Sequence, residues 1–142
     1  MTLRQLLLVA LLFLIPENTT VKFTTIDQGA TSQIETPRTA VVKTAAEWAM
    51  LWKEHAGETK PQPPAVDFPK SMVLAVFSGT KPTAAHAVEI TQVDVKDGTM
   101  IVTYREQPPP ADAMVAQVLT MPFHIVRTDA HPGKVVFQRA KN

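Results

Sequence analysis

The spacing of apolar residues predicts one helix, between residues 44 and 57. Thr44 and Glu47 form a capping box at its start, because each side chain reaches an N–H group that the first turn leaves unpaired. Gly57 suits the left-handed conformation that commonly ends a helix. Four residues recur at the spacing of a single helix face: Trp48, Leu51, Trp52 and His55. We therefore expect the two tryptophans and the leucine in the core, and His55 as a packing and capping residue.

The rest of the chain shows the alternation typical of strands, broken by twelve prolines that stiffen the connections between them. The predicted strands lie at 21–26, 38–44, 72–77, 86–95, 100–104, 115–128 and 134–138. The run 72–77 is apolar at every position, as in a central strand that a helix covers on one side. The strand at 115–128 should be interrupted at Pro122, which cannot donate to a central ladder.

A change of phase within the strand at 86–95 predicts a β-bulge. Val88 and Ile90 share one face, whereas the two valines that follow lie at the opposite parity. One extra residue near 91–92 would bring all four side chains into the core. The Asp-Gly pair that comes next predicts a tight hairpin, and Tyr104 on the return strand joins Val88 and Ile90 in the predicted core.

These elements predict an α+β fold. A single domain is expected, in which a mostly antiparallel β-sheet of about six to eight strands packs against one main α-helix. The 142 residues are close to the commonest domain size, and no internal repeat or second domain is visible. We assign residues 21–142 to this domain and residues 1–20 to a separate N-terminal segment.

Residues 1–20 have the layout of an export signal. One positive charge, Arg4, precedes an apolar run from Leu6 to Ile15 and then Pro16. The run is shorter than the roughly 20 residues that a membrane-spanning helix needs. No small-residue cleavage site is evident, so the segment is either cleaved or kept as an N-terminal tether; a buried core helix is the alternative. We expect an exported protein, periplasmic or extracellular, with membrane contact only through this segment.

The composition excludes several classes of function. The formal net charge is +1 and there is no basic stripe with interleaved aromatic residues, which argues against nucleic-acid binding. The chain has no cysteine, and therefore no disulfide, lipidated cysteine or thiolate metal site. None of Ser32, Ser71 and Ser78 lies in a nucleophile-elbow context, and the carboxylates are scattered along the chain. We expect no catalytic residue, no metal site, no cofactor and no enzymatic activity.

Three segments together carry a resemblance to a known family. They are "EWAMLWKEH", "VDFPKSMVLAVFSGTKPT" and "TMPFHIV", in this order along the chain. With them the chain resembles the PrcB-type protease complex subunit, specifically its C-terminal domain, over roughly residues 38–138. The resemblance implies a small secreted or envelope domain, in relatives often a lipoprotein. It also implies an accessory subunit that associates with a surface serine protease and stabilises it.

The sequence departs from the family pattern at one loop. Family members commonly have Thr-Gly-Gly-Tyr where this chain has Thr83-Ala84-Ala85-His86. Paired glycines would allow positive φ angles or the close approach of another backbone, and alanines make both harder. The lipobox cysteine of the family is also missing.

The stretch "FSGTKPTAAHAVEI", residues 77–90, is the candidate partner-binding site. Gly79 can leave the sheet without steric cost, Lys81 projects a charge, and Pro82 stiffens the excursion. The predicted partner-binding residues are Phe77, Gly79, Lys81, Pro82, Thr83 and His86. A neighbouring exposed strand could accept a strand from the partner. The alternative is a structural turn, since turn chemistry explains the glycine and the proline equally well.

A second hypothesis comes from a different class of function. His124 has the opposite parity to its apolar neighbours, so its side chain points either to the outer face or into a cleft beside His86. In the second case the protein is a periplasmic small-molecule or metal-binding domain that uses His86 and His124. No two histidines have the spacing of a linear metal-binding motif, and His131 lies in a turn.

Overall fold

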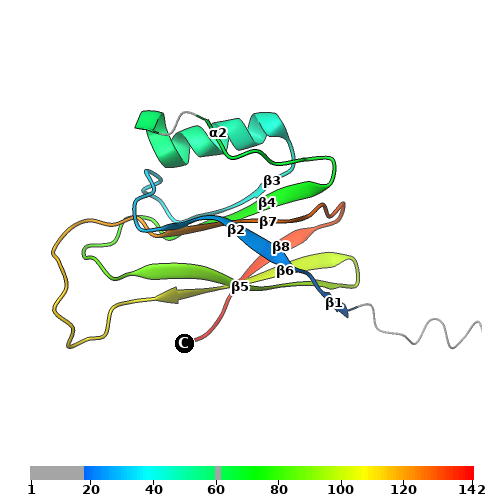
Figure 1. Ribbon diagram of the computed structural model, residues 1–142. Helices are drawn as coiled ribbons and strands as arrows, with labels where there is room; N and C mark the ends of the chain where they lie inside the picture. The colour runs from blue at the N-terminus through cyan, green and yellow to red at the C-terminus, as the bar shows by residue number, and fades with distance from the viewer. Residues whose placement is uncertain (1–17, 60–61) are drawn as a thin grey trace, which may run out of the picture.

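The computed structural model describes residues 18–59 and 62–142 as three stacked layers (Figure 1). Helix α2 (Ala45–Ala56), continued by the short 3₁₀ turn η1 (Gly57–Thr59), forms the outer layer. Two four-stranded sheets form the other two layers. Within the described residues, no helix is long and apolar enough to cross a membrane.

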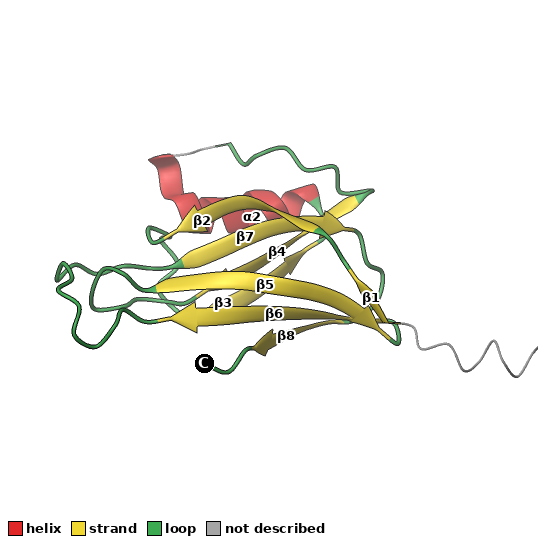
Figure 2. Cartoon of the chain, turned by 60° about the horizontal axis from the view of Figure 1, so that its bottom comes forward, coloured by secondary structure: helices red, strands yellow, loops and turns green. Residues whose placement is uncertain are grey.

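The sheet next to the helix forms the middle layer. Its strands, in spatial order, are β2 (Phe23–Gly29), β7 (Phe123–Asp129), β4 (Ser71–Phe77) and β3 (Arg38–Val42). The strands of the outer sheet, in the same sense, are β1 (Asn18–Thr20), β5 (Ala87–Lys96), β6 (Thr99–Gln107) and β8 (Val135–Arg139). All pairings are antiparallel except that of β6 with β8, which is parallel. Figure 2 shows the outer sheet, with β8 at one edge and the C-terminus beside it.

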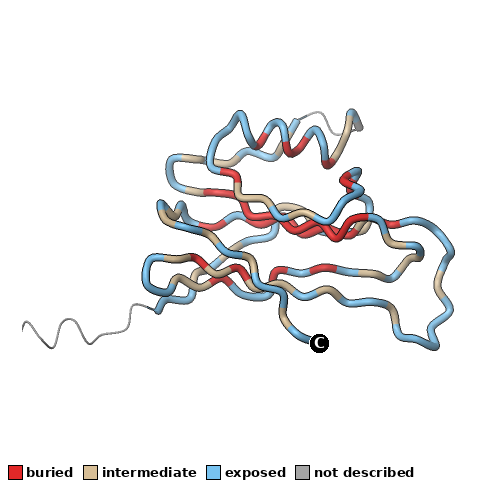
Figure 3. Tube along the Cα trace, turned by 180° about the vertical axis from the view of Figure 1, so that it is seen from behind, coloured by how far each residue is buried: buried red, intermediate tan, exposed pale blue. Residues whose placement is uncertain are grey.

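The predicted α+β class is confirmed, with two sheets in place of one. The reason lies in β4, which is apolar on both faces. Val73, Ala75 and Phe77 pack under the helix, while the residues between them pack onto the outer sheet. A strand with two apolar faces needs a cover on each side, and one helix covers only one of them. Figure 3 shows the buried residues concentrated in this middle layer.

The helix has the predicted caps and the predicted buried face. The Thr44 hydroxyl accepts a hydrogen bond from the Glu47 N–H at 3.2 Å and donates to the Glu47 carboxylate at 2.9 Å. Gly57 ends the helix as predicted, but with φ 63° and ψ −150° it lies outside the left-handed helical conformation; its N–H donates to the Lys53 carbonyl. The inward-facing residues Trp48, Leu51, Trp52 and His55 are all buried. The local signals for this helix therefore agree with its packing.

The bulge and the hairpin are also found where the sequence predicts them. The register of β5 against β6 shifts between Ile90 and Gln92. Val88 and Ile90 are buried, and Tyr104 is partly buried against the same core. The hairpin between β5 and β6 turns through an aspartate and a glycine that both have positive φ.

Two of the predicted strands begin two or more residues later in the structure. The strand predicted at 115–128 begins only at Phe123, because Pro122 ends the ladder and the preceding residues leave the sandwich as a loop. The first predicted strand begins at Phe23, because the chain crosses between the two sheets just before it: the Val21 N–H still bonds to β5. Residues 18–20, predicted as the end of the N-terminal segment, form β1; the rest of that segment lies outside the described residues.

Gly79 offers a test of how the end of β4 is fixed. Its φ is +77°, and a Cβ there would come within 2.7 Å of Pro37 Cδ and 2.9 Å of the Glu35 carbonyl oxygen. Gly98 has nearly the same φ, +79°, but nothing lies within 4 Å of its Cβ position. Gly98→Ala should cost about 1 kcal/mol from backbone strain alone, and Gly79→Ala at least about 1 kcal/mol more. The measurement is chemical unfolding of both variants; equal losses would show that the close contact has no energetic weight.

Candidate functional site

Three connections meet at one end of the sandwich. They are residues 29–35, 78–86 and 108–122, which we call the loop end; it lies at the left of Figure 1. The Lys81 N–H donates to the Thr120 carbonyl at 2.7 Å, and the Thr120 N–H returns the bond at 3.0 Å. In the connection 29–35, the Ser32 N–H donates to the Met121 carbonyl, and the Met121 N–H donates to the Ala30 carbonyl. Main-chain bonds thus hold the three connections side by side.

Two of the six predicted partner-binding residues are buried and have a structural role. Phe77 is 2% exposed and packs in the core under the helix, where its ring contacts His55. Gly79 lies against Pro37, and its positive φ lets the chain turn away from β4. The turn interpretation therefore accounts for the first part of the stretch.

The next residues of the stretch lie on the surface of the loop end. Pro82 is exposed, and Lys81 and Thr83 are partly exposed. The Thr83 carbonyl accepts a hydrogen bond from the Thr120 hydroxyl at 2.8 Å. Lys81 makes no ion pair within 4.0 Å with any residue that the structure describes. The main chain of Lys81 is thus held beside residue 120, and its ammonium group has no carboxylate partner in the described part of the chain.

The segment that departs from the family pattern has a positive φ. Ala85 has φ 68°, and the N–H of Ala84 donates to the Ala116 carbonyl at 3.0 Å. His86 is partly exposed and precedes the first residue of β5 rather than lying in the strand. The loop therefore has a glycine-like conformation at an alanine, at the cost of local strain.

Ala85→Gly should relieve this strain. Because the alanine already occupies the left-handed region, we expect the free energy of unfolding to rise by up to about 1 kcal/mol. Ala84→Gly, next in the chain and without a positive φ, should instead leave stability unchanged or lower it. Thermal and chemical unfolding measure both variants, and a loss of stability in Ala85→Gly would contradict the assignment.

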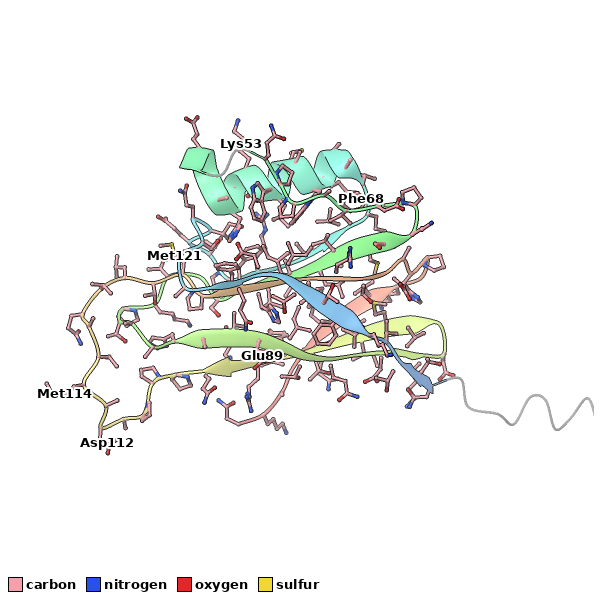
Figure 4. The ribbon with its side chains drawn as sticks, viewed as in Figure 1. Lys53, Phe68, Glu89, Asp112, Met114 and Met121 are labelled. Carbon is pink, nitrogen blue, oxygen red and sulfur yellow. The ribbon has the colours of Figure 1, made fainter. Side chains whose placement is uncertain are left out.

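The most exposed apolar side chains of the loop end were missed by the sequence prediction. Met114, Val118 and Leu119 are 102%, 53% and 69% exposed. Figure 4 shows Met114 and Asp112 at the tip of the projecting loop, while Met121 lies at its base near the sheets. The periodicity of this segment resembles that of a strand, so it was assigned to the sheet. Its only contrary signal is the prolines on either side, at 108–110 and 122.

The backbone of this segment is extended and largely unpaired. Residues 114–119 belong to no helix or strand, and within the described residues their N–H groups donate to no backbone carbonyl. The segment itself belongs to no strand, and its carbonyl at Ala116 is the one that Ala84 uses. A row of free donors beside exposed apolar side chains is the surface that an added strand requires.

His124 is a buried interior residue rather than a ligand. It is 2% exposed and points from β7 toward the outer sheet. The Ile90 N–H, at the bulge of β5, donates to Nδ1 at 2.8 Å, and Nε2 lies 2.8 Å from the Thr25 hydroxyl. Since Nδ1 accepts a bond, the hydrogen of the neutral ring is on Nε2. Both ring nitrogens are therefore engaged within the protein.

The hypothesis of a cleft with His86 and His124 has no support in this geometry. A metal needs a ring nitrogen of His124, and both already have protein partners. Across the described ranges 18–59 and 62–142, no three His, Cys, Asp or Glu side chains gather as a metal site would require. Burial lowers the pKa of His124, an effect that the nearby Glu89 carboxylate partly opposes.

The lowered pKa of His124 predicts the sign of a pH effect on stability. Below about pH 6.5 the unfolded chain binds a proton that the folded ring resists. The stabilisation from the neutral ring is complete above this pH and decreases as the pH falls toward the folded pKa.

His124→Gln should cost about 1–3 kcal/mol at pH 7.5, because the buried Ile90 N–H loses its acceptor. The stability advantage of the native chain over this variant should shrink between pH 7 and pH 5. Urea unfolding at each pH measures it, with His131→Gln as the control; a constant difference would contradict the mechanism.

His55 joins a second buried polar group, which the sequence did not reveal. Its Nδ1 lies 2.9 Å from the Ser32 hydroxyl oxygen, and its Nε2 lies 3.2 Å from Oδ2 of Asp27. The Ile34 N–H donates to the same Ser32 oxygen at 3.1 Å. A carboxylate only accepts, so Nε2 carries a hydrogen, and the Ser32 hydroxyl can donate to Nδ1 of the neutral ring. The main-chain carbonyl of His55 also accepts from the Gln33 N–H at 2.8 Å.

These residue types are those of a Ser-His-Asp triad, but the arrangement differs in two ways. Ser32 is 1% exposed, so a substrate has no access to its hydroxyl in this conformation. The serine contacts Nδ1 and the carboxylate Nε2, the reverse of the order in serine proteases. The predicted packing role of His55 is consistent with this geometry, as its ring also lies 4.2 Å from that of Phe123. The group fixes the connection 29–35 against the helix.

A cavity of about 320 Å³ opens beside this polar group. Its described lining is Asp27, Gln28, Gly29, Thr31, Gln33, His55, Ala56 and Phe123. The Asp27 side chain is 26% exposed, and its Oδ1 accepts from the Gln28 N–H at 3.0 Å. No lysine or arginine is among these residues, so the carboxylate sets the charge of the cavity.

Comparison with known proteins agrees with the resemblance found in the sequence. Residues 72–129 match the family model described as PrcB C-terminal. The match runs from β4 through β7 and includes both the 78–86 and the 108–122 connections. The predicted PrcB-type C-terminal domain is therefore confirmed for this segment. No curated protein and no solved structure gives a match.

Proposed function

We propose that the protein is a non-catalytic accessory domain that binds another protein through the loop end. The PrcB C-terminal match supports a subunit role in a protease complex. The partner would be a secreted or surface protease, or another component of its complex, and binding would stabilise it without chemistry. The proposal includes export to the periplasm or the medium, with the N-terminal segment either removed or kept as a tether.

The observation that carries the proposal is the extended segment 113–119. It presents Met114, Val118 and Leu119 to solvent together with unpaired main-chain donors. Exposed apolar side chains in one contiguous stretch are a feature of interaction sites, whereas single exposed ones are ordinary. A partner strand laid along this segment would satisfy the N–H groups and cover the apolar side chains.

The neighbouring loop adds polar contacts to this surface. Lys81, Pro82, Thr83 and His86 all have exposed area on the loop that bonds to residues 116 and 120. The positive charge of Lys81 would favour an acidic group on the partner, which affects the association rate and specificity more than the affinity. Phe77 and Gly79, also predicted for the site, would act only by holding the loop in place.

Recovery of a partner from the native host tests the proposal. The full chain is isolated under mild conditions from separate cytosolic, envelope and medium fractions, as native protein and as Leu119→Lys. Val136→Lys is the matched control, because Val136 is an exposed valine on β8, 38% accessible and outside the loop end. Unfolding curves confirm that both variants remain folded.

We expect one protein to copurify with the native chain and with Val136→Lys, in the envelope or medium fraction. Rebinding of that purified protein should weaken by about tenfold or more in Leu119→Lys, as for an anchor residue of an interface. Lys81→Glu should reduce the association rate. Equal binding by all variants, or a chain found only in the cytosolic fraction, would refute the proposed surface or the proposed export respectively.

A further inference from the structure

We propose that the cavity beside Asp27 binds an arginine side chain, supplied by the protein partner. The partner as the source of the arginine rests on the proposed function; the affinity of the cavity for a guanidinium group does not. The site is separate from the extended segment 113–119, but main-chain bonds connect them: Thr31 lines the cavity and pairs with Met121 at the base of the loop.

The charge of the cavity comes from one carboxylate. Asp27 is the one carboxylate among the described lining residues, and none of those residues is Lys or Arg. Among the described residues its nearest titratable neighbour is His55, whose Nε2 lies 3.2 Å away and whose ring carries no charge when Nδ1 accepts the Ser32 hydroxyl hydrogen. Because the carboxylate is about three-quarters buried, its field inside the cavity is less screened than on an open surface. The cavity therefore favours a cation.

Hydrogen bonds hold the Asp27 carboxylate in place. The His55 ring donates to Oδ2, and the ring itself is fixed through Ser32, whose oxygen in turn receives the Ile34 N–H. The Gln28 N–H holds the other oxygen, Oδ1. Each carboxylate oxygen can accept more than one bond, so both retain capacity for a ligand. A carboxylate fixed in this way loses little side-chain entropy on binding.

The size and the lining of the cavity also suit a single polar side chain. At about 320 Å³ it is at the small end of ligand pockets, a size suited to one side chain. Phe123 and the His55 ring line the cavity with small exposed areas, since each residue is only 3% exposed, and the side-chain amide of Gln33 is part of the lining. A Cβ on residue 57 would come within 2.5–2.6 Å of the amide nitrogen and oxygen of Gln33. Only a glycine at position 57 therefore allows the amide to lie where it does.

These features together suit a guanidinium better than an ammonium. A guanidinium is flat, and its five N–H donors, held in a rigid fork, can reach the carboxylate and an amide oxygen at once. An ammonium is a compact, strongly hydrated point charge and cannot span these two acceptors in the same way. We therefore expect arginine to bind more tightly than lysine.

A titration with small probes tests the inference on the full chain alone. Nα-acetyl-arginine amide is added to isotopically labelled protein, and the NMR resonances of Gly29, Thr31 and Gln33 are followed. Nα-acetyl-citrulline amide, which has nearly the same shape without the charge, and Nα-acetyl-lysine amide are the comparison probes. We expect saturable shifts with the arginine probe that weaken as salt is added, weaker ones with lysine and none with citrulline.

Variants separate the cavity from the rest of the surface. Asp27→Asn should weaken arginine binding by about tenfold or more, whereas Asp112→Asn, at the exposed loop tip, should have no effect. Because Asp27→Asn also alters a bond to His55, Gln33→Lys is the second variant: it places a cation at the rim and leaves Asp27, His55 and Ser32 unchanged. It should abolish arginine binding while the protein stays folded.

The outcomes distinguish this inference from the proposed function. Leu119→Lys should bind the arginine probe as the native chain does, even if it loses the protein partner. Equal binding of citrulline and arginine, equal affinities in Asp27→Asn and Asp112→Asn, or lysine binding as tight as arginine would overturn the assignment. So would the absence of saturable shifts up to the solubility limit of the arginine probe. None of these results would bear on partner binding by segment 113–119.

Discussion

Strand β4 has no face that can meet water, and neither does most of its neighbour β7. The helix covers one side of this pair and the outer sheet covers the other. In such a layer a polar group without a partner inside the protein costs free energy, because no solvent can supply the bond. His124 lies in this layer and avoids this cost by accepting the Ile90 N–H and contacting the Thr25 hydroxyl. The buried imidazole therefore links the two sheets, because His124 lies on β7 and Ile90 on β5.

Local signals in the sequence were sufficient for the elements but not for their arrangement. The capping residues of α2, the bulge after Ile90 and the Asp-Gly hairpin each depend on neighbours within a few positions, and each was found as predicted. The second sheet depends on which strands pair although they lie far apart in the sequence. The alternation of apolar and polar residues along a strand does not show which strand it pairs with. Segment 115–119 has the pattern of a strand but no ladder, since its assignment depends on partners and not on periodicity.

The two internal histidines show why the candidate site was only partly predictable. His55 was correctly placed on the buried helix face, yet its polar partners, Ser32 and Asp27, come from a loop and an edge strand with no motif in common. His124 has a parity that indicates only which face it occupies; whether that face meets solvent or another sheet is decided by β5. For the same reason, the loop at 79–86 was visible as a turn, while the apolar segment that it bonds to was not.

The pairing of β2 with β7 spans nearly the whole described chain: Phe23 lies opposite Thr128, and the Thr25 and His124 side chains that meet are 99 residues apart. A nascent chain thus cannot complete the middle layer until its last quarter is available, so the edge of β4 that pairs with β7 must wait without a partner. Contacts this distant in sequence make folding slow and the waiting state prone to aggregation. For such a topology the period before β7 arrives, rather than the finished fold, is when the chain depends most on protection by other proteins.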